Sequence, residues 1–501
     1  MNVFFGCQGS ITEHFIFLDT LLSKSEHNYK SHFWIGNKYE FKKNKFGEYF
    51  KNNKINFFKE WDFINDKGKI NLEERSYVKN KFKNLNLWNI IIADRRLMYG
   101  SESKYKQKYS PKYTFYELQN IIYHTLATLD KYIITNKIDL IVTFVPSCFG
   151  TFILNTIAEK NKIKLRQLRA SKIEDVVLFS DTIKATPKFI AKKYDLNIKN
   201  YPNIKNINQG KEYLNKLVNF DAKYSGSERI KKKFNNKLKY FNIYKYTYKL
   251  LNYFKYIDTN NKINFYDYLF HKFFISKFKK YKIKKLIKSR MINLNKDTNR
   301  KVLFYPLNSE PEIAISIHSR NHQNQIETLR RISQSIPLDW ILVVKEHPRS
   351  IGIRSINYYK KILEIPNLYF YNNNETSKYC IKNCDAVCTL TGFIGFEAIV
   401  QKKPVILLGD SFYSSLPSTM VKRVKNMEKF YDDFIYLIDN YKYQEINILS
   451  LICAHFEYGK KIDIYKTILN KPVKKITNNL DYEGSIINLK KLLLDSIDLH
   501  G

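Results

Sequence analysis

Short apolar segments alternate with amphipathic ones between residues 302 and 408. The apolar segments are Val302–Tyr305, Trp340–Val344, Leu368–Tyr371, Ala386–Leu390 and Val405–Leu408, and helical spacing fits Gln323–Ser335, Ile356–Leu363, Thr376–Asn383 and Ile394–Val400. Such regular alternation is typical of a parallel sheet in which a helix follows each strand. The sequence therefore predicts a Rossmann-like domain in this part of the chain.

A similar alternation runs through the first two hundred residues. Strands are predicted at Val3–Phe5, Phe33–Ile35, Leu140–Val145 and Val176–Phe179, and helices at Tyr116–Ile134 and Gly150–Ala158. A chain of 501 residues is too long for one ordinary core, which agrees with two domains. We therefore predict an α/β fold with two Rossmann-like domains in a GT-B-like arrangement.

The predicted domain boundaries follow the composition of the chain. Residues 1–200 form a Rossmann-like domain on the acceptor side, 201–298 a basic, aromatic-rich helical linker or insert, and 299–501 a nucleotide-sugar-binding Rossmann-like domain with closing C-terminal helices. Loops at the carboxyl ends of strands line the ligand crevice in open α/β sheets, so functional residues are expected there.

The basic insert is the most unusual segment in composition. Residues 229–290 hold 19 Lys or Arg against two acidic residues, with 17 aromatic residues interleaved. Such a segment can stack on bases, contact an anionic membrane surface, or form helices whose lysine stems cover apolar surface. Peripheral contact with the inner membrane and a purely structural role both stay open here.

The formal charge of +38 invites a nucleic-acid interpretation. Lysine, however, is abundant along almost the whole chain and no nucleic-acid-binding motif is visible, so we expect no nucleic-acid partner.

Six scattered cysteines fit a reducing compartment better than a disulfide framework. The first residues lack the basic and apolar regions of a signal peptide, so the sequence favours a cytoplasmic location.

A glycine-containing loop follows the predicted strand 386–390. It reads Thr391-Gly392-Phe-Ile-Gly395-Phe-Glu397 and leads into a helix. Glycine permits close backbone approach, and free N–H groups at a helix start favour an anion, so a phosphate can bind here. Thr391 can either cap the helix or bind phosphate, and Glu397 can either bind a sugar hydroxyl or complement the helix dipole.

A second candidate loop follows the strand 340–344. Lys345 and His347 come directly after this apolar strand and could neutralise a nucleotide leaving group. Departure of a nucleotide builds negative charge, which fixed cations and helix dipoles stabilise. The sequence therefore predicts a donor site from Lys345, His347 and the glycine loop.

Several motifs in register resemble the capsule polysaccharide biosynthesis family, which includes β-Kdo transferases. They are residues 304–312 (FYPLNSEPE), 344–349 (VKEHPR), 391–398 (TGFIGFEA), 403–409 (KPVILLG) and, more loosely, 88–96 (WNIIIADRR). The resemblance implies a GT-B-like glycosyltransferase that holds a nucleotide sugar through Lys345, His347, Thr391, Gly392, Gly395 and Glu397. The acceptor would be a polysaccharide or glycolipid. Asn308 departs from the histidine expected in the first motif, so Kdo is one donor sugar among several.

The candidate catalytic residues are Asp94, Glu312 and His347. Sugar transfer requires a base for the acceptor hydroxyl or a carboxylate nucleophile. Asp94 lies beside Arg95 and Arg96, so a structural ion pair is its alternative role. Glu310 is a further candidate next to Glu312.

No DxD motif or clustered metal ligands are evident, so we expect metal-independent transfer without a cofactor. Three alternatives stay open. The chain could be a nucleotide-sugar epimerase, a polyol-phosphate transferase, or a non-catalytic partner in capsule assembly or export.

Overall fold

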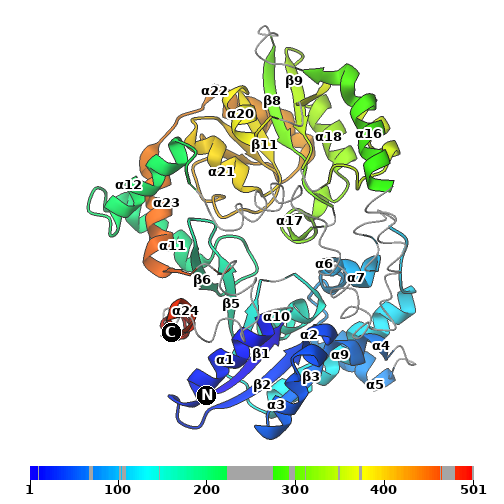
Figure 1. Cartoon of the computed structure of the whole chain (residues 1–501), viewed down its shortest axis with the longest axis vertical. Helices are drawn as coiled ribbons and strands as arrows, with labels where there is room; N and C mark the ends of the chain where they lie inside the picture. Colours follow the sequence, from blue (N-terminus) through cyan, green and yellow to red (C-terminus); the bar gives the residue numbers. More distant parts are fainter. Residues whose placement is uncertain are drawn as a thin grey trace, which may run out of the picture.

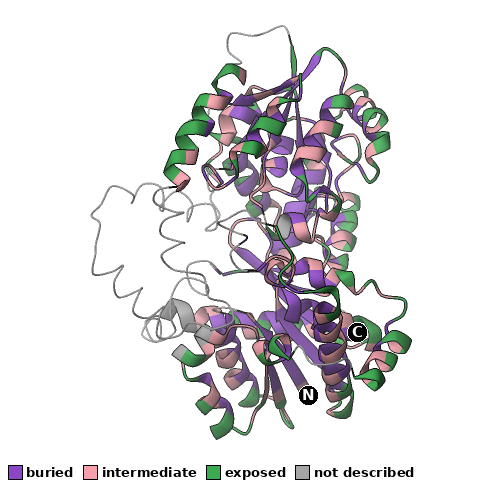
Figure 2. Ribbon diagram, turned by 90° about the vertical axis from the view of Figure 1, so that its right-hand side faces the viewer, coloured by how far each residue is buried: buried purple, intermediate pink, exposed green. Residues whose placement is uncertain are grey.

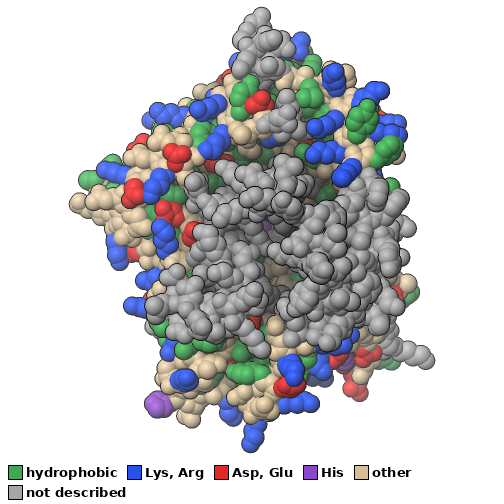
Figure 3. Space-filling model, viewed as in Figure 1, with side chains coloured by type: hydrophobic (Ala, Val, Ile, Leu, Met, Phe, Trp, Pro, Cys, Tyr) green, Lys and Arg blue, Asp and Glu red, His purple; other side chains and the backbone are tan. Residues whose placement is uncertain are grey.

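The computed structural model describes residues 1–8, 11–66, 71–100, 103, 109–145, 147–222, 275–292, 300–310, 312–347, 350–371, 375–462, 464 and 480–498. Two seven-stranded sheets lie one above the other along the longest axis (Figure 1). Most of the predicted basic insert falls outside these residues. Within them, Lys and Arg are spread over the face seen in Figure 3 rather than gathered in one patch.

The first sheet has the strand order β14-β6-β5-β4-β1-β2-β3. Its strands are β1 (Asn2–Cys7), β2 (Lys30–Ile35), β3 (Asn56–Lys59), β4 (Leu140–Phe144), β5 (Lys164–Ala170), β6 (Val176–Ser180) and β14 (Lys460–Lys461). β1 to β5 are parallel, while β6 runs antiparallel to β5 and β14 antiparallel to β6. All four strands predicted from the sequence are present.

Helices cover both faces of this sheet. They are α1 (Ile11–Ser23), α2 (Lys38–Lys43), α3 (Phe46–Asn52), α4 (Glu60–Asn65), α5 (Leu72–Lys81), α6 (Trp88–Ala93), α7 (Arg95–Met98), α9 (Phe115–Thr135), α10 (Phe149–Asn161) and α24 (Leu480–Asp498). Side chains alternate along β1: Val3 and Phe5 pack with α1 and α24, while Phe4 packs with α9 and α10. A box of reciprocal hydrogen bonds between Thr114 and Glu117 starts α9.

The second sheet is parallel throughout, in the order β13-β12-β11-β8-β9-β10-β7. Its strands are β7 (Met291–Ile292), β8 (Lys301–Pro306), β9 (Trp340–Lys345), β10 (Leu368–Tyr371), β11 (Ala386–Thr389), β12 (Val405–Leu407) and β13 (Val421–Arg423). Its helices are α16 (Ser276–Ile287), α17 (Ile313–Ser316), α18 (Gln325–Gln334), α19 (Ile356–Leu363), α20 (Ser377–Lys382), α21 (Phe393–Val400) and α22 (Phe430–Asp439). Every strand and helix predicted in this half is present within two residues.

The strands of both sheets are the most buried parts of the molecule (Figure 2). The predicted fold class, an α/β chain with two Rossmann-like domains, is therefore confirmed. The end of the predicted insert forms α16, whose Ile283 and Ile287 pack into the core of the second sheet.

Three helices join the two sheets: α11 (Lys188–Lys199), α12 (Ile207–Val218) and α23 (Glu445–Tyr458). Their apolar side chains share one core with Leu178 of the first sheet and Val343 of the second. After α23 the chain returns to the first sheet through β14 and α24. The predicted boundaries at 200, 298 and 501 stay a prediction, although residues after Lys460 pack with the first sheet.

The described residues bear on two features expected to be absent, a membrane-spanning helix and disulfides. None of the helices within the described ranges is both long and apolar enough to cross a bilayer. All six cysteines are buried and free, as small apolar thiols would be.

The returning helix α24 should support the first sheet. Leu489 is fully buried against α1 and the sheet, whereas Ile487 on the same helix is 58% exposed. We expect Leu489→Ala to lower the free energy of unfolding by about 2–5 kcal/mol, because it leaves a cavity. Chemical denaturation measures the change, and Ile487→Ala is the control, expected to change it by less than about 0.5 kcal/mol. Equal effects would contradict this packing.

Candidate active site

The two sheets face each other through the loops at the carboxyl ends of their parallel strands. A cavity of about 660 Å³ lies between these loops. Gln8, Asp94, Arg95, Ser147 and Cys148 line it from the first domain, and Glu310, Glu312, Gln323, Asn324 and Tyr358 from the second. This is where ligands bind in open α/β sheets. We call it the large cavity.

A second cavity of about 300 Å³, called the small cavity, lies between the same sheets. Arg169 and Lys172 line it at the end of β5, with His318, Thr391 and Asp410 from the second domain. Glu312 lines both cavities. The Ala185 N–H donates to Asp410 Oδ2 at 2.7 Å, so the domains are also joined by hydrogen bonds beside this cavity.

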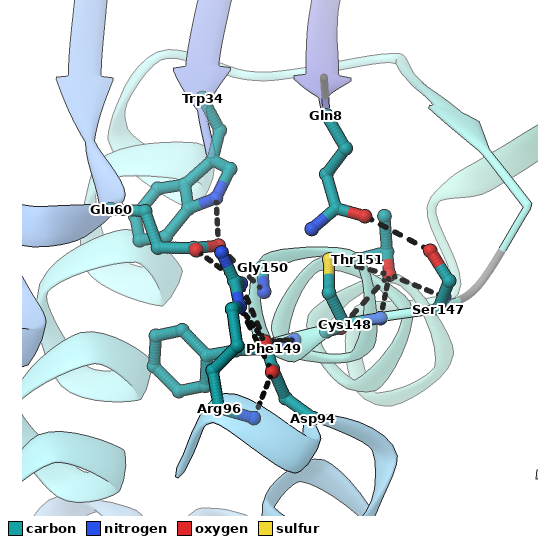
Figure 4. Close-up of polar contacts among 10 residues, drawn as sticks. All are labelled: Gln8, Trp34, Glu60, Asp94, Arg96, Ser147, Cys148, Phe149, Gly150 and Thr151. Carbon is teal, nitrogen blue, oxygen red and sulfur yellow. Dashed lines mark hydrogen bonds and ion pairs between the residues drawn. The ribbon is translucent and has the colours of Figure 1, made fainter. Parts of the chain in front are cut away.

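Asp94 is held by a dense set of contacts (Figure 4). It caps α7 by accepting the Arg96 N–H at 2.8 Å, and Arg96 Nη2 lies 2.5 Å from Asp94 Oδ2. The Phe149 N–H at the start of α10 donates to the same oxygen at 3.1 Å. Burial alone would raise the pKa of Asp94, but Arg96 and these hydrogen bonds lower it below its ordinary value.

Glu60, which sequence reasoning missed, shares the same guanidinium. Arg96 Nη2 lies 2.7 Å from Glu60 Oε1, while Trp34 Nε1 and the Gly150 N–H both donate to Oε2 at 3.2 Å. Burial raises the pKa of Glu60, and the charge of Arg96 offsets this rise only in part. Asp94 and Glu60 together therefore hold α6, α7 and the start of α10 in place. Because the pKa of Asp94 is lowered, Asp94 is a poor proton acceptor.

Glu312 is exposed, unlike the buried carboxylates of Asp94 and Glu60. Its side chain is exposed at the cavity surface, at the start of α17, where its carbonyl accepts the Ile315 N–H at 3.0 Å. Its negative charge is felt by Arg95 and by Lys172, whose pKa burial lowers and Glu312 raises. Glu312 is thus a carboxylate that substrate can reach from either cavity.

Glu310 and Glu346 belong to a buried network around Arg354. Arg354 Nε lies 3.7 Å from Glu346 Oε2, and Nη1 lies 3.9 Å from Glu310 Oε1. Tyr359 donates to Glu346 at 2.5 Å. Burial raises the pKa of Glu310, and Arg354 lowers it in part. Through Arg354, these two carboxylates hold the loops after β8 and β9.

The same network explains why Asn308 is tolerated in the first motif. Its N–H donates to Gln325 Oε1 at 2.9 Å, and its carbonyl accepts from Gln325 Nε2 at 3.0 Å and from Arg354. The backbone of residue 308, rather than its side chain, makes these hydrogen bonds.

Lys345 and His347 flank Glu346 but line neither of the two cavities. Lys345 is buried at the end of β9, and burial lowers its pKa. The His347 N–H donates to Glu346 Oε1 at 2.8 Å, so the Arg354 network also sets this backbone. Pro348 and Arg349 lie outside the described residues. Donor binding by Lys345 and His347 stays a prediction.

The glycine loop is positioned by Tyr413. The Tyr413 hydroxyl donates to the Gly392 carbonyl at 2.8 Å, and a Cβ on Gly395 would lie 2.1 Å from the hydroxyl oxygen. Gly395 therefore permits close packing. Thr391 lines the small cavity, whereas Glu397 lies on α21. Burial raises the pKa of Tyr213 on α12, and the nearby charge of Glu397 raises it further. The roles of Thr391, Gly392, Gly395 and Glu397 in binding a donor stay predictions.

Sequence reasoning missed Arg169, Lys172, His318 and His455, all at the small cavity. Among the described residues, no group of three or more His, Cys, Asp or Glu side chains could hold a metal ion. Metal-independent chemistry stays a prediction.

The chain is thus a two-domain α/β protein with cavities between its Rossmann-like halves. The sequence model of the capsule polysaccharide biosynthesis protein family matches residues 207–426. The match, which covers less than half of the chain, confirms the resemblance seen in the motifs.

The chain is also similar to individual proteins. Protein FixF of Sinorhizobium fredii is 30% identical over 119 residues, which span 22% of this chain and 27% of FixF. The KpsC β-Kdo 2,7 transferase of Thermosulfurimonas dismutans is 14% identical, with 69% of this chain and 88% of that chain covered and a TM-score of 0.30.

A UDP-GlcNAc 2-epimerase from Neisseria meningitidis, solved with UDP-GlcNAc, is 12% identical, with 94% and 100% covered and a TM-score of 0.24. A glycosyltransferase from Rickettsia africae is 11% identical, with 94% and 99% covered and a TM-score of 0.26.

The structural role of Asp94 can be tested by its pH dependence. Because folding lowers the pKa of Asp94, its ionised form stabilises the protein above the ordinary carboxyl pKa of 3.8, and this stabilisation is lost as pH falls. We expect Asp94→Asn to reduce the free energy of unfolding at neutral pH by about 1–3 kcal/mol.

Urea denaturation of both proteins at several pH values measures this difference, which should shrink below pH 3.8. Asp339→Asn is the control, because Asp339 is 61% exposed and its ion pair with Lys301 is long, at 3.9 Å. A difference for Asp94→Asn that does not vary with pH would refute the assignment.

Proposed function

We propose that this protein is a glycosyltransferase that moves a sugar from a nucleotide donor to a capsule or surface polysaccharide, or to its lipid linker. The observation that carries the proposal is Glu312, a reachable carboxylate lining two adjoining cavities between the domains. The family match supports the capsule context.

The two cavities suit the two substrates of such a reaction. The donor would bind toward the second domain, where Thr391, two residues before α21, lines the small cavity. Backbone N–H groups at a helix start favour the donor phosphate. The acceptor would occupy the large cavity, which is open to the first domain through Gln8, Ser147 and the α6–α7 corner.

Glu312 is the proposed reacting carboxylate. Both oxygens of Asp94 accept hydrogen bonds from Arg96, which lower its pKa. Glu310 accepts from Gln325 and lies 3.9 Å from Arg354 Nη1, so it is already part of the Arg354 network. Glu312 faces both cavities and can act as a general base or a nucleophile. The cations Arg95 and Lys172 keep negative charge favourable there.

The donor sugar is proposed only as a class. Two T. dismutans KpsC proteins to which the chain is similar are β-Kdo transferases, which makes a Kdo-like acid on CMP one candidate. UDP-linked sugars are the other, given the epimerase solved with UDP-GlcNAc. A metal ion is not required by this proposal.

A nucleotide panel tests the donor. Ligands that bind only the folded state raise its melting temperature. We expect one of CMP, CDP, UDP and GDP to raise the melting temperature, with calorimetry giving its Kd. Lack of response to all four would favour a non-catalytic capsule partner, and conversion of a nucleotide sugar without any acceptor would favour an epimerase.

Substitution of Glu312 tests the chemistry. We expect Glu312→Gln to slow transfer by about 10²- to 10⁴-fold, because the amide cannot accept the acceptor proton or attack the sugar. Nucleotide Kd and melting temperature should stay unchanged, as measured by calorimetry and thermal denaturation. The control is Glu364→Gln, because Glu364, which follows the last residue of α19, is 62% exposed. Full activity of Glu312→Gln would remove Glu312 from the mechanism.

A further inference from the structure

The small cavity has a chemical character that the proposed transfer reaction does not by itself explain. It is lined from both domains and from α23, the helix that crosses between them. Arg169, Lys172 and His455 lie outside residues 207–426, the range of the family match.

His455 is the most unusual of these groups. It is 1% exposed, yet neither Nδ1 nor Nε2 has a hydrogen-bond partner. Burial lowers its pKa to about 3, so the ring is neutral and offers one N–H donor. An orphaned polar group of this kind normally costs about 1–3 kcal/mol, unless a ligand or water completes it.

Arg169 also has a buried nitrogen without a hydrogen-bond partner. Its Nη1 donates to the Lys184 carbonyl at 2.5 Å and its Nη2 to the Thr182 carbonyl at 2.6 Å, which fixes the guanidinium plane. Its buried Nε has no partner. No carboxylate within the described ranges forms an ion pair with it, so its charge is balanced only at longer range, by Asp410 and Asp181.

Lys172 and His318 complete the set. Within the described part of the chain, neither side chain makes a hydrogen bond or an ion pair, although Lys172 feels Glu312 at longer range. Burial and the charges of Lys172 and Arg169 lower the pKa of His318 to about 4. Two cations and two neutral imidazoles thus border the small cavity, together with the carboxylates of Glu312 and Asp410. Arg169 Nε and both ring nitrogens of His455 are buried there without a hydrogen-bond partner.

We propose that the small cavity is a binding site for an oxyanion of the substrate, held by Arg169, Lys172, His318 and His455. A phosphate or carboxylate group has several acceptor oxygens, which matches guanidinium, ammonium and imidazole N–H donors. The inference rests on the proposed function, because the oxyanion belongs to the nucleotide sugar. Its two sources are the donor phosphate and a carboxylate on an acidic sugar.

The site also couples binding to the arrangement of the domains. Arg169 and Lys172 come from the first sheet, His318 follows β8 in the second, and His455 lies on α23. An oxyanion contacting all of them is bound most tightly when the two sheets face each other as they do here. Substrate binding therefore favours the closed arrangement.

Calorimetry with small oxyanions tests the site without requiring turnover. The probes are inorganic phosphate and pyrophosphate for the phosphate source, and glucuronate for the carboxylate source. The variants are His455→Phe, which keeps a ring against Phe412, and Lys172→Gln. The control is Lys162→Gln, because Lys162 also has a positive φ, 56° against 70° for Lys172, but is exposed and lines neither cavity.

We expect at least one probe to bind the wild-type protein and both variants to weaken it by about tenfold or more. Lys162→Gln should bind as the wild type does. His455→Phe should keep or raise the melting temperature, since it removes an orphaned polar group. The probe that binds names the source of the oxyanion.

Absence of binding by every probe, or equal Kd values in all variants, would overturn the oxyanion site and leave a cavity that holds only water. The proposed transferase function fails separately, by lack of nucleotide binding and turnover in the wild type. Oxyanion binding that depends on His455 and Lys172 in a protein without turnover would keep the site and reject the transferase.

Discussion

The buried guanidinium of Arg354 is the interaction on which the second half of the cleft depends. It lies between Glu346 and Glu310 and also donates to the Asn308 carbonyl, so one side chain orders the loops after β8 and β9. Removing one member of such a buried group leaves an uncompensated charge, which makes the whole arrangement cooperative. The position of Glu312 follows from it, since Glu312 lies two residues beyond Glu310.

In the first domain, too, one arginine lies between two carboxylates. Arg96 holds Asp94 and Glu60 together, and Phe149 and Gly150 complete the two carboxylates with backbone N–H groups (Figure 4). Both sides of the cleft are thus built from carboxylates that serve as anchors. Glu312, the carboxylate that we propose reacts, differs from these anchors because it is exposed at the start of a short helix.

The sequence predicted the second sheet almost residue by residue, because apolar periodicity reports burial directly, as for Ile356–Leu363. It could not separate Glu310 from Glu312 or reveal that Asp94 is an anchor, since these roles depend on Arg354 and Arg96, whose contacts are set by folding. It also missed His455, which is distant in sequence from every motif and reaches the small cavity only because α23 crosses between the sheets.

The crossing helices limit how the two halves can move. The chain passes between the domains through α11 and α12 and comes back through α23, and these three helices pack together on one side (Figure 1). Two chain passages bound side by side resist sliding and twisting but allow bending about their common line. We therefore expect any bending between the two halves to centre on α11, α12 and α23, and to change the contact between α6 and α17.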